Sequence, residues 1–179
     1  SSRVADNLFW LGRYAERLEI SARLIRVLLP AVSGKSEESR HTPVETIWHF
    51  LRGLELLPHG YRTTAATAQW WSVQRLLAEM VFDATHPFGI GWSLKEVRRL
   101  SWEVKERLSP DTWRVLRQLE GIFAEPPPAN HERRYVAALA ALDDVVVMLS
   151  AFAGLLAENP TRGHGWRFLG IGRRMERAL

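Results

Sequence analysis

The chain has no cysteine among its 179 residues. This absence excludes disulfide bonds, thiolate metal sites and thiol nucleophiles. A chain of this length can bury enough apolar surface to fold as one domain without such supports. We therefore expect a single domain over residues 1–179. A cytoplasmic location suits a chain without cysteine.

Lysine is also scarce, because only Lys35, Lys95 and Lys105 are lysines among the 24 residues that are Lys or Arg. The guanidinium group of Arg is planar and binds carboxylates or phosphates through two hydrogen bonds at once. The bias towards Arg fits structural ion pairs, and it equally fits an anion-binding site. The net charge is only +4, so charge alone does not decide between them.

The usual signatures of catalysis are missing. The sequence contains no phosphate-binding Walker loop, no dinucleotide fingerprint, no nucleophile elbow and no Ser-His-Asp order. Its six histidines lack the H-x-x-x-H and H-E-x-x-H spacings. We expect no metal and no cofactor.

No long hydrophobic run is free of charge. The most apolar stretch, residues 135–157, has Asp143 and Asp144 at its centre, where carboxylates are costly in lipid. We predict a buried core helix there and expect no membrane partner. The chain begins at Ser1 without a signal peptide, and its last helix is still running at Leu179, so we expect a piece of a longer protein.

Helical spacing of apolar residues recurs almost everywhere, and no window alternates in the manner of a strand. The sequence therefore predicts an all-α bundle of about seven helices with an internal pseudo-repeat. Their expected ranges are about 3–29, 43–58, 66–82, 88–108, 110–125, 131–158 and 165–179.

Proline and capping residues set these limits. Pro30 is expected to end the first helix, and Thr42-Pro43 to start the second. Ser93 and Ser109 each begin a pattern typical of a helix N-cap. The triple proline at residues 126–128 predicts a rigid linker.

One short motif occurs twice. Residues 12–17 read G-R-Y-A-E-R, and residues 172–177 read G-R-R-M-E-R, an offset of 160 positions. The apolar residues before the motif match in the same register. Repetition at a fixed offset indicates duplicated architecture. A glycine within a helix costs about 1 kcal/mol relative to alanine, so Gly12 predicts the close approach of another helix.

The motif places Arg13 and Glu16 on one helical face, and Arg173 and Glu176 on another. We expect the two helices to pack around a pseudo-twofold axis, with Glu16 meeting Arg173 or Arg177 and Glu176 meeting Arg13 or Arg17. Asp143 and Asp144 would be further counter-ions. The alternative is that the same charges line a cleft that binds a phosphate or carboxylate.

Two other features have alternative interpretations. Asp83 precedes a helix break and could cap the next helix or reach an Arg of the motif. Several of the eight tryptophans alternate with arginines between residues 92 and 114, which could serve core packing or stacking on a nucleic-acid strand. Acidic residues are mixed through that region, so nucleic acid is only a distant alternative.

The segments 3–17, 82–87 and 165–178 closely resemble the alpha-E family, a predicted all-helical domain named for its E-R motif. Members are typically longer, with a second half that echoes the first, so this chain looks like a first repeat plus the opening helix of a second. The family often has Asn-Pro where this chain has His86-Pro87. It commonly has a polar residue where this chain has Gly170.

The resemblance implies a function near ATP-dependent amide or peptide ligation, because alpha-E domains occur beside or fused to circularly permuted ATP-grasp proteins. We expect a helical partner or substrate-holding module that acts with an ATP-grasp ligase and has an Arg/Glu cleft. The expected partners are an ATP-grasp-type ligase, fused or separate, a peptide substrate and a second copy of the chain. A stand-alone enzyme with Glu16 and Glu176 as acid and base is the alternative from another class.

The candidate site residues share charge and proximity to the two motifs. They are Asp6, Arg13, Glu16, Arg17, Asp83, Asp143, Asp144, Arg173, Glu176 and Arg177.

Overall fold

The computed structural model describes residues 2–32, 44–53, 57, 70–86, 89–158 and 164–179. Over these residues the chain forms seven α-helices and no strand, which confirms the all-α prediction. The helices are α1 (Ser2–Ala31), α3 (Val44–Gly53), α4 (Trp70–Phe82), α5 (Ile90–Glu103), α6 (Pro110–Gly121), α7 (His131–Glu158) and α8 (His164–Ala178), with a 3₁₀ turn η1 (Lys105–Arg107) after α5.

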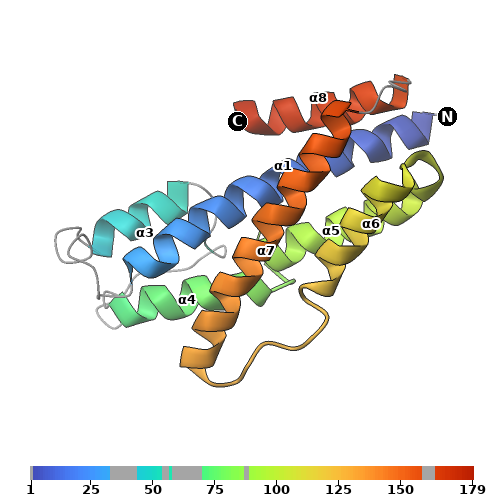
Figure 1. Cartoon of the computed structure of the whole chain (residues 1–179). Helices are drawn as coiled ribbons and strands as arrows, with labels where there is room; N and C mark the ends of the chain where they lie inside the picture. Colours follow the sequence, from blue (N-terminus) through green and yellow to red (C-terminus); the bar gives the residue numbers. More distant parts are fainter. Residues whose placement is uncertain (1, 33–43, 54–56, 58–69, 87–88, 159–163) are drawn as a thin grey trace.

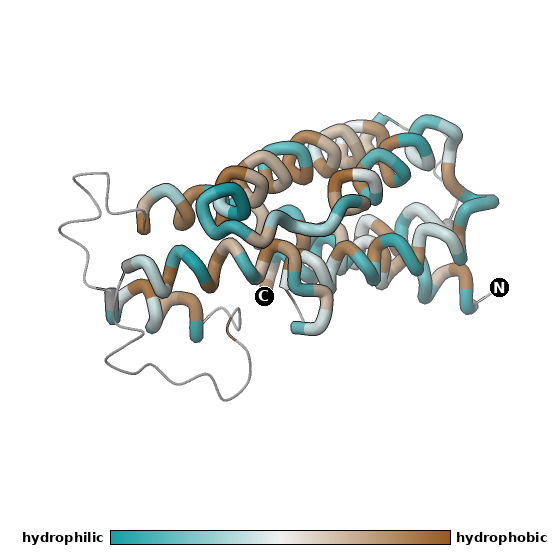
Figure 2. The backbone as a smooth tube through the Cα atoms, turned by 90° about the horizontal axis from the view of Figure 1, so that it is seen from below, coloured by the Kyte–Doolittle hydropathy of each residue, from teal (hydrophilic) through white to brown (hydrophobic). Residues whose placement is uncertain are grey.

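Helix α1 is the centre of the bundle. It contacts α8 on one side and α4 and α5 on the opposite side, and α7 crosses it (Figure 1). Its buried apolar residues recur at helical spacing from Leu8 to Leu29. Figure 2 shows the resulting alternation of polar and apolar residues along the helices. The long first helix therefore packs directly on α4, α5, α7 and α8.

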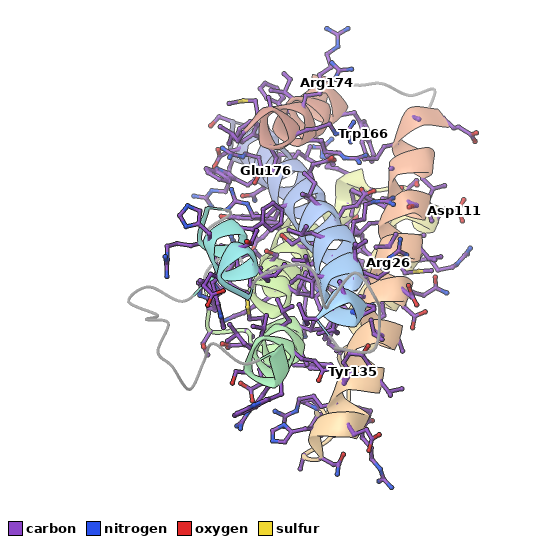
Figure 3. All side chains as sticks on the ribbon, turned by 90° about the vertical axis from the view of Figure 1, so that its left-hand side faces the viewer. Arg26, Asp111, Tyr135, Trp166, Arg174 and Glu176 are labelled. Carbon is purple, nitrogen blue, oxygen red and sulfur yellow. The ribbon has the colours of Figure 1, made fainter. Side chains whose placement is uncertain are left out.

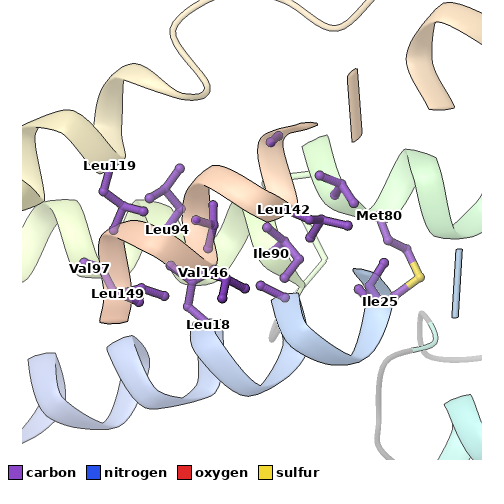
Figure 4. Packing of buried hydrophobic residues seen from close by; sticks show 14 of the residues in the cluster. Leu18, Ile25, Met80, Ile90, Leu94, Val97, Leu119, Leu142, Val146 and Leu149 are labelled. Atoms are coloured by element: carbon purple, nitrogen blue, oxygen red, sulfur yellow. The ribbon is translucent and has the colours of Figure 1, made fainter. Parts of the chain in front are cut away.

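The core lies between α1, α4, α5, α6 and α7. Leu18 and Ile25 of α1 face Ile90 of α5 and Leu142 and Val146 of α7 (Figure 4), and these five side chains are almost completely buried. Burial of a side chain of this size contributes about 1.5–3 kcal/mol relative to exposure. The contacts hold α1 rigidly, and α1 in turn positions the first copy of the repeated motif.

Helix α7 buries one face and exposes the other. Its buried residues run from Ala138 to Phe152 at helical spacing, and it packs on α1, α4 and α6. By length and composition α7 is apolar enough to cross a membrane, but such helices are also common in protein cores. Asp143 and Asp144 lie on its exposed face, so the sequence interpretation of a core helix holds for one face only.

The boundaries predicted from proline and glycine are partly wrong. Helix α1 continues one residue beyond Pro30, because a proline in the last turn removes only one hydrogen bond of the helix. Helix α5 ends at Glu103 rather than near Leu108, since Val104 leaves helical geometry and its side chain enters the core. Ser109 does cap α6, and its hydroxyl accepts a hydrogen bond from the Thr112 backbone N–H at 3.2 Å.

The predicted capping box at Ser93 is also wrong. Helix α5 has already begun at Ile90, with Gly89 at the N-cap position, and the backbone N–H of Ser93 donates to the Gly89 carbonyl. A Cβ atom on Gly91 would lie 2.7 Å from the carbonyl oxygen of Asp83. The start of α5 is therefore fixed by its packing on the preceding turn rather than by a side-chain cap.

Some sequence predictions fall outside the described residues. These are the cap at Thr42-Pro43, the end of the second helix near residue 58 and the start of the third helix at residue 66. The triple proline does join α6 to α7 without helix.

Candidate functional site

The two copies of the repeated motif lie side by side on α1 and α8, which form the most extensive helix pair of the fold (Figure 1). The two helices run in the same direction, because residues further along α1 contact residues further along α8. Leu8 touches Gly165, Gly12 approaches Leu169, and further along Glu16 meets Arg173.

Glycine in each motif allows the two backbones to touch. A Cβ atom on Gly12 would overlap the carbonyl oxygen of Leu169 and lie 3.0 Å from its carbonyl carbon. A Cβ atom on Gly172 would do the same to Phe9, again at 3.0 Å from the carbonyl carbon. Phe9 and Leu169 are 160 residues apart, like the two glycines. The contact is therefore reciprocal, as a pseudo-twofold axis along the helix pair requires.

The charges of the motifs are paired across the same axis. Glu16 accepts hydrogen bonds from Nε of Arg173 at 2.8 Å and from Nε of Arg177 at 2.7 Å. Glu176 accepts from Nε of Arg13 at 2.7 Å and from Nε of Arg17. The cross-pairing predicted from the repeat is therefore present.

Both glutamates are buried, with exposed fractions of 2% for Glu16 and 9% for Glu176. Figure 3 shows Glu176 on the side of α8 that faces α1. A buried carboxylate is stable only when charged partners or hydrogen bonds compensate the loss of water. Each carboxylate here uses both oxygens on two guanidinium groups. Such saturated groups hold helices in register.

One contact departs from the symmetry. Arg173 also reaches Glu19 at 3.4 Å, and Glu19 binds Arg23 one turn further along α1. The position that corresponds to Glu19 in the second copy is Leu179. The cluster therefore extends along α1 and not along α8.

The remaining aspartates of the candidate list do not join this cluster. Asp143 pairs with Arg26 at 3.2 Å on the surface, and Asp144 and Asp6 are exposed. The prediction that Asp143 and Asp144 are counter-ions of the motif is wrong, because both lie on the face of α7 opposite its core residues.

Asp83 has a local role. Its Oδ1 accepts hydrogen bonds from the backbone N–H of Thr85 at 2.8 Å and from the Thr85 hydroxyl at 2.6 Å. The hydrogen bond from the Thr85 hydroxyl is the main cause that lowers the pKa of Asp83. The side chain closes the turn before α5 but does not cap that helix, whose N-cap is Gly89, so the predicted cap is wrong.

An aromatic layer covers the outer side of the first motif. The ring centres of Trp10 and Tyr14 lie 5.6 Å apart in a stacked arrangement, and the ring centres of Tyr14 and Trp92 of α5 lie 5.3 Å apart in a T-shaped arrangement. The guanidinium of Arg13 lies 5.5 Å from the centre of the Trp10 ring. Burial, with Glu96 nearby, raises the pKa of the Tyr14 phenol.

An exposed apolar stripe on α8 was not among the features predicted from the sequence. Its residues are Phe168, Ile171 and Met175, with exposed fractions of 41%, 44% and 48%. Their counterparts in the first copy, Leu8, Leu11 and Ala15, are buried. The repeat offers a way to find this stripe, because each of its exposed residues lies 160 positions after a residue that is buried in α1.

The tryptophans of α5 and α6 have cationic partners within the chain. Trp102 and Trp113 meet edge to face at 4.8 Å, and Lys105 lies over both rings at 5.3 and 5.4 Å. Arg99 and Arg114 pair with Glu96 and Asp111 on the same helices. This arrangement does not favour the nucleic-acid interpretation. Among the described residues no group of His, Asp or Glu could hold a metal ion.

The two copies of the E-R motif thus join α1 to α8 through two reciprocal glycine contacts and two reciprocal Glu-Arg clusters. This arrangement is expected of a duplicated motif. The Alpha-E family, described as a predicted alpha-helical domain with a conserved ER motif, matches residues 1–179. The chain belongs to the Alpha-E family. In the two copies of the repeated motif the E-R pairs are Glu16-Arg17 and Glu176-Arg177.

Related proteins occur in mycobacteria. "Uncharacterized protein Rv2567" of Mycobacterium tuberculosis and "Uncharacterized protein Mb2597" of Mycobacterium bovis are each 28% identical to this Alpha-E chain over 189 residues. The match covers all of this chain and 21% of each relative, so the chain spans about a fifth of their length. No solved structure matches the chain significantly.

Proposed function

We propose that this Alpha-E chain is a helical partner module of an ATP-grasp-type ligase in ATP-dependent amide or peptide bond formation, and that α8 is the helix that contacts the ligase. The observation that carries the proposal is the exposed stripe of Phe168, Ile171 and Met175. Its equivalents on α1 are covered by neighbouring helices, which makes an uncovered copy a candidate interface.

The charges beside the stripe indicate what kind of surface would cover it. Helix α8 carries Arg167, Arg174 and Arg177 as exposed side chains, and its one acidic residue, Glu176, is buried against α1. A complementary surface would have an apolar centre and acidic residues at its margin. We assign that surface to the ligase. The family resemblance and the much greater length of the relatives support a role within a larger assembly.

The rival interpretation, in which Glu16 and Glu176 perform acid and base catalysis, has less support. A general acid or base must reach the proton that it transfers. Both carboxylates are buried between two helices and each is bound to two arginines. A substrate would have to separate α1 from α8 to reach them.

The experiment measures binding and ATP turnover of a purified circularly permuted ATP-grasp protein from the same organism, with and without this chain. We expect binding by the parent chain and a change in the rate of ATP turnover. Met175→Asp should weaken binding at least tenfold, because it places a carboxylate in the centre of an apolar contact.

Val27→Asp is the matched control, since Val27 is an exposed apolar residue in the second half of α1. It should bind like the parent. Equal binding by Met175→Asp and Val27→Asp would overturn the assignment of α8. Failure of the parent to bind would overturn the ligase as partner. Sedimentation of the chain alone checks whether the stripe instead joins two copies, in which case Met175→Asp would convert a dimer to a monomer.

A further inference from the structure

A groove opens between the last turns of α7 and the outer side of α8. Its volume is about 670 Å³, within the range of roughly 300–1,000 Å³ that small-ligand sites occupy. Leu156 of α7 and Trp166 of α8 give the groove apolar lining, and Gly170 of α8 lines it as well. Figure 3 shows Trp166 on the side of α8 towards α7, with Arg174 at the outer edge of the helix.

The groove is lined by cations without anions. Four arginines contribute to it, namely Arg167, Arg173, Arg174 and Arg177, and no Asp or Glu is among its described lining residues. Arg173 and Arg177 share the carboxylate of Glu16. Arg167 and Arg174 are exposed and form no ion pair with another described residue. The local charge is therefore positive and uncompensated, which attracts an anion.

The pseudo-twofold axis shows what is missing from this groove. Gly170 is the counterpart of Trp10, and Arg173 is the counterpart of Arg13. On α1 the indole of Trp10 fills the corresponding place beneath the Arg13 guanidinium, 5.5 Å from its ring centre. On α8 a Cβ atom at position 170 would meet nothing within 4 Å. The second copy thus has the cation and the space, but no ring of its own.

We infer that this groove binds an anionic ligand that carries an aromatic ring, of the kind presented by a peptide segment with an aromatic side chain and a carboxylate. The ring lies over Gly170 against the Arg173 guanidinium, as Trp10 lies against Arg13. The carboxylate pairs with Arg167 and Arg174 at the outer edge. Cation–π contact and two-point arginine pairing are the interactions that recognise such a group.

This inference goes beyond the proposed function and does not depend on a ligase. The groove and the apolar stripe share Ile171, and the exposed arginines of α8 border both, whereas Phe168 and Met175 do not line the groove. Binding of a small ligand and binding of the ligase are therefore measured in separate assays, and Gly170→Trp and Met175→Asp each change a residue that belongs to one surface only.

The test uses indole-3-acetate as the probe, with tryptamine and acetate as comparisons, and isothermal titration calorimetry on the full chain. Indole-3-acetate has the ring and the carboxylate, tryptamine has the ring with a positive charge, and acetate has the charge alone. We expect indole-3-acetate to bind at least tenfold more tightly than either comparison. Equal binding of tryptamine, or no binding of indole-3-acetate, would overturn the inference.

Gly170→Trp is the decisive variant, because it supplies the ring from the chain itself and fills the groove. We expect affinity for indole-3-acetate to fall at least tenfold while the circular dichroism spectrum stays unchanged, since position 170 is open. Gly121→Trp is the matched control, at an equally open glycine at the end of α6. Unchanged affinity in Gly170→Trp would contradict the site.

A second pair of variants tests the charge. Arg174→Glu should reduce the affinity for indole-3-acetate at least tenfold and should improve the binding of tryptamine. Arg114→Glu, an exposed arginine on α6, should change neither. An Arg174→Glu variant that binds both probes like the parent would exclude the anion-binding role.

Discussion

Replacement of Gly12 by alanine tests the closest contact of the fold. At an open helical position this substitution stabilises a protein by up to about 1 kcal/mol, because alanine has the higher helix propensity. At Gly12 the added methyl group would overlap the carbonyl oxygen of Leu169, which belongs to a rigid helical backbone. Helix α8 must therefore move away from α1.

The magnitude follows from two opposing terms. Overpacking costs about 1–3 kcal/mol, and displacement of α8 also lengthens the contacts of Glu16 with Arg173 and Arg177. After subtraction of the gain in helix propensity, we expect a net loss of about 1–3 kcal/mol. For a chain of this length each kcal/mol shifts Tm by roughly 2–4 °C, so Tm should fall by roughly 2–12 °C.

Gly170→Ala is the control on the partner helix, because a Cβ atom there meets nothing within 4 Å. Its Tm should rise by up to about 4 °C. Thermal unfolding followed by circular dichroism gives Tm, and hydrogen exchange of residues 164–178 shows whether α8 separates before the rest unfolds. A rise in Tm for both variants would refute the close approach of α1 and α8.

Two further predictions concern buried and hydrogen-bonded carboxylates. Glu16→Gln removes the carboxylate that Arg177 and Arg173 share and leaves Arg173 with Glu19 alone, so it should lower the free energy of unfolding by about 3–5 kcal/mol. Asp143→Asn, in an exposed pair, should change it by at most about 1 kcal/mol. Equal urea midpoints for these two variants would contradict the structural role of Glu16. Asp83 has a lowered pKa, so its contribution to stability is present above about pH 4 and disappears as the pH falls through the folded-state pKa. Asp83→Asn should therefore be less stable than the parent at pH 7, with a difference that shrinks towards pH 3; a difference independent of pH would show that the carboxylate charge does not matter.

Much of the fold could be predicted because its signals are local. Ser109 and Pro110 start α6 through the geometry of a single turn, and the apolar residues of α7 define a long helix. The cross-pairing of Glu16 and Glu176 is a tertiary contact, yet it was predictable because the repeat relates the two helices. Each copy of the motif carries both Glu and Arg, so when the two helices pack together the Glu of one copy meets the Arg of the other.

Two errors have different physical origins. Ser93 begins a pattern that normally caps a helix, but α5 starts three residues earlier, because Gly91 packs against the turn at Asp83. That contact is tertiary and leaves no local signal. The misplacement of Asp143 and Asp144 was avoidable, because the spacing of the buried residues of α7 already puts both aspartates on the opposite face.

The stripe and the groove on α8 could not be predicted from local sequence signals or from the repeat alone. Whether Phe168 is buried depends on which elements surround α8, and the sequence of α8 resembles that of a helix with a covered face. Only comparison of equivalent positions in the two copies, with the structure of one copy as reference, separates uncovered residues from core residues.

The difference between the two copies locates specificity better than their likeness does. The motif fixes the surface through which α1 and α8 touch, so a substitution at Gly12, Glu16 or their counterparts changes stability first. The outer faces are free of that constraint, and there the copies differ most, with Trp10 on α1 and Gly170 on α8. If recognition resides on the outer face of α8, Gly170→Trp must change binding without lowering Tm. Gly12→Ala must lower Tm first, whereas Arg173 belongs to the motif and also lines the groove, so its variants should change both stability and binding. A variant set in which Gly170→Trp and Gly12→Ala had the same effects would return the motif itself to consideration as a binding site.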